Sequence, residues 1–294
     1  MHYKVMIKTI FKLSLATVTY TLLFMVANAF LPFSQEFKDL GSSGEPMALL
    51  FFLISSAWVC FTIFFIIIHA KYSGMKLFLN LVLVLFFIQN FMTQIETLFF
   101  GQAFTVISKK DIILIMLTGL FPILGVAALL VKIFPNKNSV PIKSSMTKKE
   151  TIFKLSIIGI IYLCVYMVFG YFVAWQFSDL RLFYTGSTEK LSFWGQMVNN
   201  FNTNPIIFPF QIIRGILFGA AIIPIKNMIE NKKHFMVSVC LVYLCTAIVL
   251  IIPNVLFPDM VRIAHLIEMF SSMILFGIIV GIIFCYNKDK KTST

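Results

Sequence analysis

Five ionisable residues stand in stretches of the chain that are otherwise apolar: Glu96, Arg214, Arg262, His265 and Glu268. An ionisable side chain inside a membrane is costly unless it is paired or hydrated, and such residues often mark ion or solute pathways. Carboxylates and imidazoles can exchange protons, and a guanidinium can hold an anionic group in a fixed geometry. The set therefore predicts a site that binds a polar or anionic solute and is sensitive to protonation.

The stretch that contains Glu96 is unusually polar, because it also holds Gln89, Thr93 and Gln94. In a regular helix, with about 100° between residues, Gln89, Thr93 and Glu96 share one face and Gln94 lies beside it. A polar arc of this kind cannot face lipid. We therefore expect it to face other helices or water.

A second polar face lies in the last apolar stretch, where His265, Glu268 and Ser272 fall on one side of a helix. The rise per residue places Glu96, Arg214, His265 and Glu268 at similar depths in the outer half of the membrane. We expect these four side chains to line one outer-facing cavity. The candidate solute-binding or proton-coupling residues are thus Glu96, Arg214, His265 and Glu268, with Gln89, Gln94 and Ser272 in support.

Two other interpretations of these residues stay open. In the first, Glu96 or Glu268 pairs with Arg214 in a structural network, and the chain is a membrane subunit that binds partner subunits or a second copy of itself. In the second, His265 and Glu268, at the i, i+3 spacing of some helical-bundle metal sites, join Glu96 as weak candidate metal ligands of an intramembrane enzyme. The chain contains neither H-E-x-x-H nor G-x-S-x-G, so an enzyme is less favoured and no cofactor is assigned.

The elements that must position these residues are membrane-spanning helices. Of the 294 residues, 59% are hydrophobic and only 12% are charged, which excludes an ordinary soluble domain. A helix of about 20 apolar residues spans a bilayer, and eight stretches reach that length. The sequence therefore predicts an all-α, polytopic integral membrane protein. The spans are expected near residues 13–33, 47–70, 77–100, 112–131, 152–174, 206–224, 235–253 and 262–286.

The distribution of charge predicts how the spans are oriented. Most of the 24 lysines and arginines fall in alternate connecting segments and at both ends of the chain, whereas acidic residues favour the other segments. By the positive-inside rule both termini are cytoplasmic, and the composition favours a bacterial inner membrane. No basic domain with interleaved aromatic residues lies outside the spans, so the bilayer, and not nucleic acid, is the expected partner. The alternative of a signal peptide cleaved after Ala29 is less favoured, because the first span is also part of an internal repeat.

That repeat is the sequence T-I-F-K-L-S, found at residues 9–14 and again at 151–156. At the same offset Tyr20 corresponds to Tyr162, so the first and fifth spans are interpreted as copies. Two four-span halves would then have the same orientation and be related by an axis along the membrane normal. The predicted organisation is a first half at 1–134, a cytoplasmic basic linker at 135–150 and a second half at 151–294.

Two pairs of glycines, Gly215 with Gly219 and Gly277 with Gly281, are spaced four residues apart within spans. Small residues at this spacing let helix backbones approach closely, so both pairs are predicted to pack against neighbouring helices.

The longest external loop is expected at residues 175–205. Within it, apolar residues from Leu191 through Trp194 to Phe201 recur at helical spacing. This pattern predicts a short amphipathic helix in the outer membrane interface, able to cover an outer cavity or simply to anchor the loop.

Overall fold

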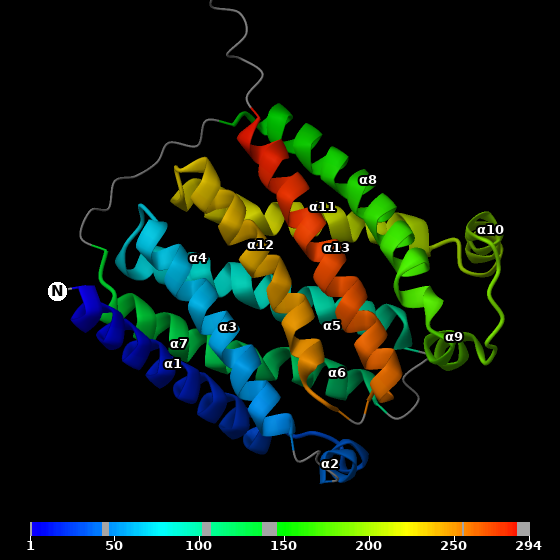
Figure 1. Ribbon diagram of the computed structural model, residues 1–294, viewed down its shortest axis with the longest axis horizontal. Helices are drawn as coiled ribbons and strands as arrows, with labels where there is room; N and C mark the ends of the chain where they lie inside the picture. Colours follow the sequence, from blue (N-terminus) through cyan, green and yellow to red (C-terminus); the bar gives the residue numbers. More distant parts are fainter. Residues whose placement is uncertain (1, 43–46, 102–106, 137–145, 255, 287–294) are drawn as a thin grey trace, which may run out of the picture.

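The computed structural model describes residues 2–42, 47–101, 107–136, 146–254 and 256–286, and within these ranges the chain is helical and contains no strand. Residues 137–145 of the predicted basic linker lie outside them. The helices (Figure 1) are α1 His2–Phe30, α2 Gln35–Ser42, α3 Ala48–His69, α4 Gly74–Leu85, the π-helix η1 Phe86–Phe91, α5 Met92–Phe99, α6 Lys109–Thr118, α7 Leu120–Ile133, α8 Lys148–Phe172, η3 Ala174–Gln176, α9 Ser178–Thr185, α10 Phe193–Thr203, α11 Ile207–Met228, α12 Lys232–Ile248, η4 Val249–Ile251 and α13 Asp259–Cys285.

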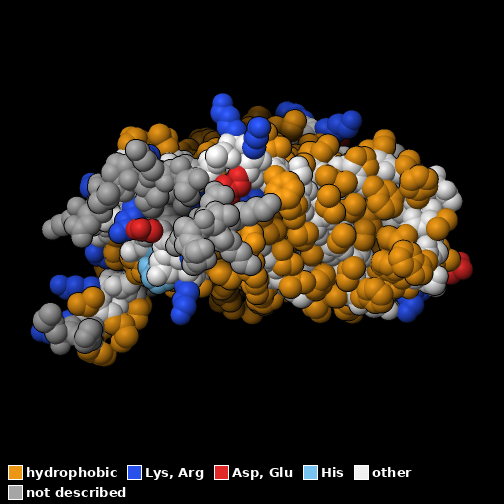
Figure 2. All heavy atoms as spheres, turned by 90° about the horizontal axis from the view of Figure 1, so that it is seen from above, with side chains coloured by type: hydrophobic (Ala, Val, Ile, Leu, Met, Phe, Trp, Pro, Cys, Tyr) orange, Lys and Arg blue, Asp and Glu red, His pale blue; other side chains and the backbone are white. Residues whose placement is uncertain are grey.

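Eight helical segments of the described chain are long and apolar enough to cross a membrane, which confirms the predicted number of spans. The third span joins α4, η1 and α5, and the fourth joins α6 and α7. Large apolar side chains remain exposed along the spans, as lipid contact requires. Figure 2 shows hydrophobic side chains over most of the visible face. The chain is a multi-pass membrane protein.

Several helices begin earlier than the apolar pattern predicted. Helix α1 starts at His2 and not near residue 13, and α8 starts at Lys148 and not at 152. A helix need not stop where the hydrocarbon ends, because lysine is a good helix former and can extend it into water. The start of α8 is also capped, since the Thr147 hydroxyl accepts a hydrogen bond from the backbone N–H of Glu150.

The long loop predicted at residues 175–205 contains two α-helices, of which one was expected. Helix α10 confirms the predicted amphipathic helix, and its Trp194, Val198 and Phe201 side chains are exposed while Gln196 is buried. Helix α9 was not predicted, because its eight residues carry no long apolar pattern. In Figure 1 both helices lie at one end of the bundle, with α2 at the same end.

The packing partners of the spans follow a regular scheme. In the first half α1 packs against α3 and α7, and α7 also packs against α4. In the second half α8 packs against α11 and α13, and α13 also packs against α12. Between the halves α3 contacts α12, α4 contacts α11, and η1 contacts α12. Each of these contacts has a counterpart, apart from that of η1 in the third span with α12 in the seventh. The contacts of α3 with α7 and of α11 with α12 have no counterpart of similar extent.

Two lysine side chains donate hydrogen bonds to helix C-termini at one end of the bundle. Lys12, near the start of α1, donates to the carbonyl of Ile133 at the end of α7 over 2.8 Å. Lys154, at the corresponding place in the repeat, donates to the carbonyl of Tyr286 after α13, also over 2.8 Å. Both satisfy a carbonyl at a helix C-terminus, where a cation is favourable. The starts of α1 and α8 and the ends of α7 and α13 therefore lie at one end, called here the lysine end.

The glycines of the predicted pairs lie where helices approach closely. A Cβ added to Gly215 would lie 2.5 Å from the Cβ of Tyr162 and 2.8 Å from the Cα of Gly159 on α8. Gly219 also faces α8, whereas Gly277 and Gly281 face Cys240 and Met236 on α12. The contact at Gly215 is backbone against backbone, so a side chain there cannot be accommodated by a rotamer change alone.

We expect Gly215→Ala to lower the free energy of unfolding by about 2 kcal/mol, because α8 and α11 must move apart. Gly170→Ala on α8 is the matched control, since nothing lies within 4 Å of its added Cβ and alanine favours the helix. Unfolding of both purified variants in mixed micelles with increasing dodecyl sulfate, followed by circular dichroism, makes the comparison. Equal stabilities would show that the close approach is not needed.

Candidate functional site

A buried ion pair joins the third and sixth spans. The Nη2 atom of Arg214 on α11 lies 2.6 Å from the Oε2 atom of Glu96 on α5. The Arg214 side chain is only 1% exposed, whereas that of Glu96 is 25% exposed. The guanidinium also donates to the carbonyl of Met92 and, over 2.9 Å, to the side-chain oxygen of Gln211. Of the two carboxylates that the sequence offered to Arg214, the structure pairs it with Glu96.

Aromatic rings surround the other sides of the Arg214 guanidinium. Its central carbon lies 5.6 Å from the ring centroid of Tyr162, 5.7 Å from that of Phe210 and 5.9 Å from that of Phe218. A cation over an aromatic face is attracted by the ring quadrupole, and this attraction strengthens when water is absent. The rings therefore help to retain a charge that a membrane interior would otherwise exclude.

The hydrogen bonding of this pair is incomplete. Among the residues that the structure describes, the Nε atom of Arg214 and the Nε2 atom of Gln211 are buried and have no hydrogen-bond partner. Arg214 is 1% exposed and Gln211 is fully buried. A buried donor without an acceptor costs about 1–3 kcal/mol, so native proteins leave few of them and a water or ligand often fills the place. Each of these two donors could take an acceptor oxygen.

A second polar cluster links the loop to the last span. The hydroxyl of Tyr184 on α9 lies 3.0 Å from Nε2 of His265 on α13. The Nδ1 atom of His265 lies 3.9 Å from Oε2 of Glu268, and the Ser272 hydroxyl donates to Oε1 of Glu268 over 3.5 Å. The residue Glu268 is 8% exposed. Its carboxylate is therefore buried with two long contacts.

Tyr184 reaches this cluster from the loop side. Burial, with the charges of Glu96 and Glu268 nearby, raises the pKa of the Tyr184 phenol well above its usual value. The hydroxyl therefore stays protonated at neutral pH and can donate to Nε2 of His265. The His265 tautomer that accepts this bond carries its proton on Nδ1, which faces Glu268.

The two clusters are neighbours. The Tyr162 ring on α8 lies near the Arg214 guanidinium and also packs against Phe276 of α13. Helix α8 packs against both α11, which carries Arg214, and α13, which carries His265 and Glu268. The structure thus pairs Glu96 with Arg214 and places His265 beside Glu268. It adds Gln211 and the tyrosines. Hydropathy patterns do not single out the tyrosines, because Tyr is common in ordinary spans.

The supporting amides of the third span do not join this group. The Nε2 atom of Gln89 donates to the Tyr20 hydroxyl on α1 over 3.3 Å, and Gln94 contacts the side chain of Thr93. The predicted shared face assumed a regular helix. The π-helix η1 holds Gln89 and adds a residue to the turn, so side chains on its two sides no longer align. Ser272, the third of the supporting residues predicted from the sequence, does contact Glu268.

Arg262 makes contacts of its own at the start of α13. It donates to the carbonyls of Leu250 and Ile251 and pairs with Asp259 at 2.7 Å. These contacts tie the start of α13 to the end of the seventh span.

Within the described ranges no three His, Cys, Asp or Glu side chains are grouped to hold a metal ion. Glu96 is paired with Arg214, so the three weak candidate ligands Glu96, His265 and Glu268 do not form such a group in the described part of the chain. A cavity of about 490 Å³ lies elsewhere, between the start of α4 and the end of α7.

The fold and site define a helical membrane protein with a buried charge cluster between spans three, five, six and eight. No family model, no curated protein and no solved structure matches the chain.

Proposed function

We propose that this protein binds a small polar or anionic solute at the Glu96, Arg214, Glu268 and His265 cluster and carries it across the membrane. The observation that carries the proposal is the pair of unpartnered donors on Arg214 and Gln211. The oxygens of a carboxylate, phosphate or carbonyl group of a solute would accept from these donors, in place of water. An arginine retained inside a membrane bundle is more often part of a pathway than of the scaffold.

Glu268 and His265 are proposed to couple binding to protonation. Glu268 has no close cation, since His265 is 3.9 Å away and Ser272 offers one long hydrogen bond. An anion bound at Arg214 would bring a further negative charge near this carboxylate.

Helix α9 is proposed as the cover of an outer-facing cavity. Its Leu180 packs with Val261 and Ala264 of α13, and its Tyr184 contacts His265. Opening this contact would expose His265 and the charges behind it. In this arrangement the lysine end is cytoplasmic and α9 lies outside, in agreement with the positive-inside rule.

We also infer that the chain arose by duplication, with halves at 1–134 and 151–294 and parallel orientation. Three observations support this: the repeated hexapeptide, the matched packing partners of the two halves, and the equivalent bonds of Lys12 and Lys154. A pathway between two such halves is a common way to build a transporter.

A structural or partner-binding role is the second candidate, and the short Glu96–Arg214 pair favours it. In that case the charges hold helices together and take no solute.

A ligand screen separates the two functions. Thermal unfolding of the purified protein is measured with inorganic anions, small carboxylates, amino acids and, as uncharged controls, sugars. We expect at least one anionic or zwitterionic solute to raise the unfolding temperature, by an amount that corresponds to about 2.7 kcal/mol at a hundredfold excess over its dissociation constant.

The variant is Gln211→Leu, which removes one unpartnered donor together with the hydrogen bond that Arg214 donates to Gln211, while both charges of the Glu96–Arg214 pair stay. The solute concentration that gives the same stabilisation should rise about tenfold, because a hydrogen bond to a charged group contributes about 1.5 kcal/mol. If every solute that stabilises the protein acts equally on Gln211→Leu, or if none acts, the structural role is favoured.

A further inference from the structure

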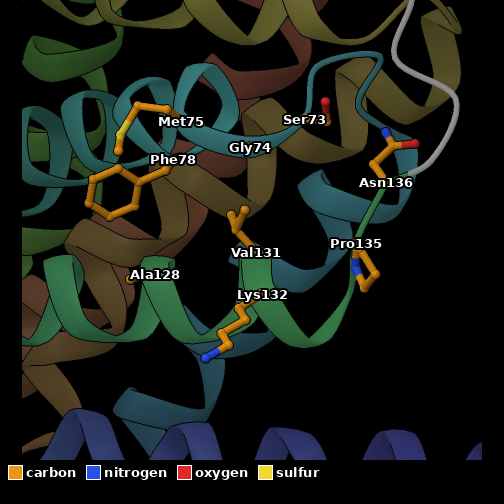
Figure 3. A pocket seen from close by; sticks show the side chains of 9 residues that line it. All are labelled: Ser73, Gly74, Met75, Phe78, Ala128, Val131, Lys132, Pro135 and Asn136. Atoms are coloured by element: carbon orange, nitrogen blue, oxygen red, sulfur yellow. The ribbon is translucent and has the colours of Figure 1, made fainter.

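A groove opens on the surface of the bundle between the third and fourth spans, at the lysine end. It encloses about 490 Å³ and is lined by Ser73, Gly74, Met75, Phe78, Ala128, Val131, Lys132, Pro135 and Asn136. Figure 3 shows Met75 and Phe78 of α4 on one side, with Ala128 and Val131 of α7 opposite them. Ser73 and Asn136 lie together at the other end of the groove. The groove is therefore apolar along the helices and polar where the helices meet the connecting segments.

Its position in the chain places the groove at a membrane boundary. Gly74 is the first residue of the third span, and Ile133 is the last residue of the fourth. Met75 and Ala128 are exposed, so the apolar part opens sideways, toward the place of the lipid tails, and not into the core of the bundle. In a bilayer, lipid chains lie against this side of the groove.

One residue that lines the groove, Lys132, is basic, and two further lysines lie near the start of α4. Lys132 projects from α7 beside the groove and is exposed, and Lys76 lies with its Nζ atom 3.7 Å from the ring centroid of Tyr72. Lys71 is in the same turn of chain, where it pairs loosely with Glu230 at 3.8 Å. Lysines at this level attract anionic headgroups, each with about 1 kcal/mol near a charged surface.

A comparison with the other half adds backbone donors to the polar end of the groove. Helix α12, the counterpart of α4, is capped by the Asn231 side chain, which accepts from the N–H groups of Lys233 and His234. Helix α4 follows Ser73, whose side chain makes no capping hydrogen bond. The first N–H groups of α4 are thus open at the polar end of the groove, where they favour an anion.

We propose that this groove binds one anionic phospholipid of the surrounding leaflet. An acyl chain lies along Phe78, Ala128 and Val131, and the phosphate lies near Ser73, Lys132 and the start of α4. The bound lipid fills the gap between the third and fourth spans. Because the third span also carries Glu96, the lipid steadies the helix that holds one partner of Arg214.

The test uses full-length protein that has been stripped of lipid in detergent. Phosphatidylglycerol, phosphatidylcholine with the same acyl chains, and glycerol 3-phosphate are added separately. Bound lipid is counted by mass spectrometry of the intact complex, and stability by thermal unfolding. We expect retained phosphatidylglycerol and a raised unfolding temperature, with little effect of the other two compounds.

Two variants locate the site. Lys132→Gln should weaken the binding of phosphatidylglycerol about fivefold, whereas Lys233→Gln, which removes a charge at the same end but in the other half, should leave it unchanged. Ala128→Trp should displace the acyl chain and abolish retention.

Three results would each overturn the proposal. Glycerol 3-phosphate that stabilises as well as the lipid would indicate a soluble anion as the ligand. Equal retention of phosphatidylcholine would remove the role of charge. Unchanged binding in both Lys132→Gln and Ala128→Trp would place the lipid elsewhere.

Discussion

Glu96→Gln is expected to destabilise the protein by about 3 kcal/mol, and Arg214→Met by about half as much. Removing one partner of a buried ion pair leaves the other charge uncompensated, at a cost of about 3–5 kcal/mol when that charge is fully buried. The two substitutions leave different charged side chains in the protein. Without Glu96, the guanidinium of Arg214 stays charged, because arginine does not lose its proton, and its side chain is 1% exposed. Without Arg214, the quarter-exposed Glu96 can reach water or take up a proton.

The measurement is a double-mutant cycle on the free energy of unfolding in mixed micelles. The double variant Glu96→Gln/Arg214→Met should be more stable than Glu96→Gln alone, because methionine replaces the buried charge with an apolar side chain of similar length. Ser156→Ala on the exposed part of α8 is a suitable control for handling, since that hydroxyl bonds only to its own helix. Additive effects, or a larger loss from Arg214→Met, would show that the pair is not the dominant contact of Arg214.

The sequence predicts the membrane class and the number of spans because both depend on one local property. A run of about 20 apolar residues reports the thickness of the bilayer whatever its neighbours are. The ends of the spans are less well predicted: Lys148 and Thr147 continue or cap a helix outside the lipid, where hydropathy carries no signal. The π-helix around Gln89 also has no local signature, and it moved that amide away from the other candidates.

The partners of the buried charges depend on which helices pack together, so they lie beyond reach of a single sequence. The spacing placed Glu96, Arg214 and Glu268 at similar depth but left open which carboxylate meets the guanidinium. The packing of α8 against α11 and α13 determines which side chains lie near these charges. Gln211 could have been noticed, because it stands three residues before Arg214 on the same helix face. Tyr184 could not, since it reaches His265 from a loop helix distant in the chain.

Glu268→Gln is expected to have the opposite effect on stability to Glu96→Gln: the free energy of unfolding is kept or raised by about 1 kcal/mol, while the pH dependence of the solute response is lost. The Glu268 carboxylate is buried, yet its contacts are a 3.5 Å hydrogen bond from Ser272 and His265 at 3.9 Å. A buried charge with so few partners does not stabilise a fold, and a neutral amide of the same shape removes its desolvation cost. Natural proteins keep such unfavourable groups at functional sites.

The readout is solute-dependent stabilisation, or uptake into proteoliposomes, measured for wild type and variant between pH 5 and pH 8 (roughly the range in which carboxylate and histidine sites exchange protons). If Glu268 binds a proton with the solute, the wild type depends on pH and Glu268→Gln does not. Ser272→Ala is the matched variant, because it removes the hydroxyl bond and keeps the titrating group, so its pH dependence should remain. A loss of several kcal/mol in Glu268→Gln, with no change in solute response, would instead assign this carboxylate to the network that holds α13 in the bundle.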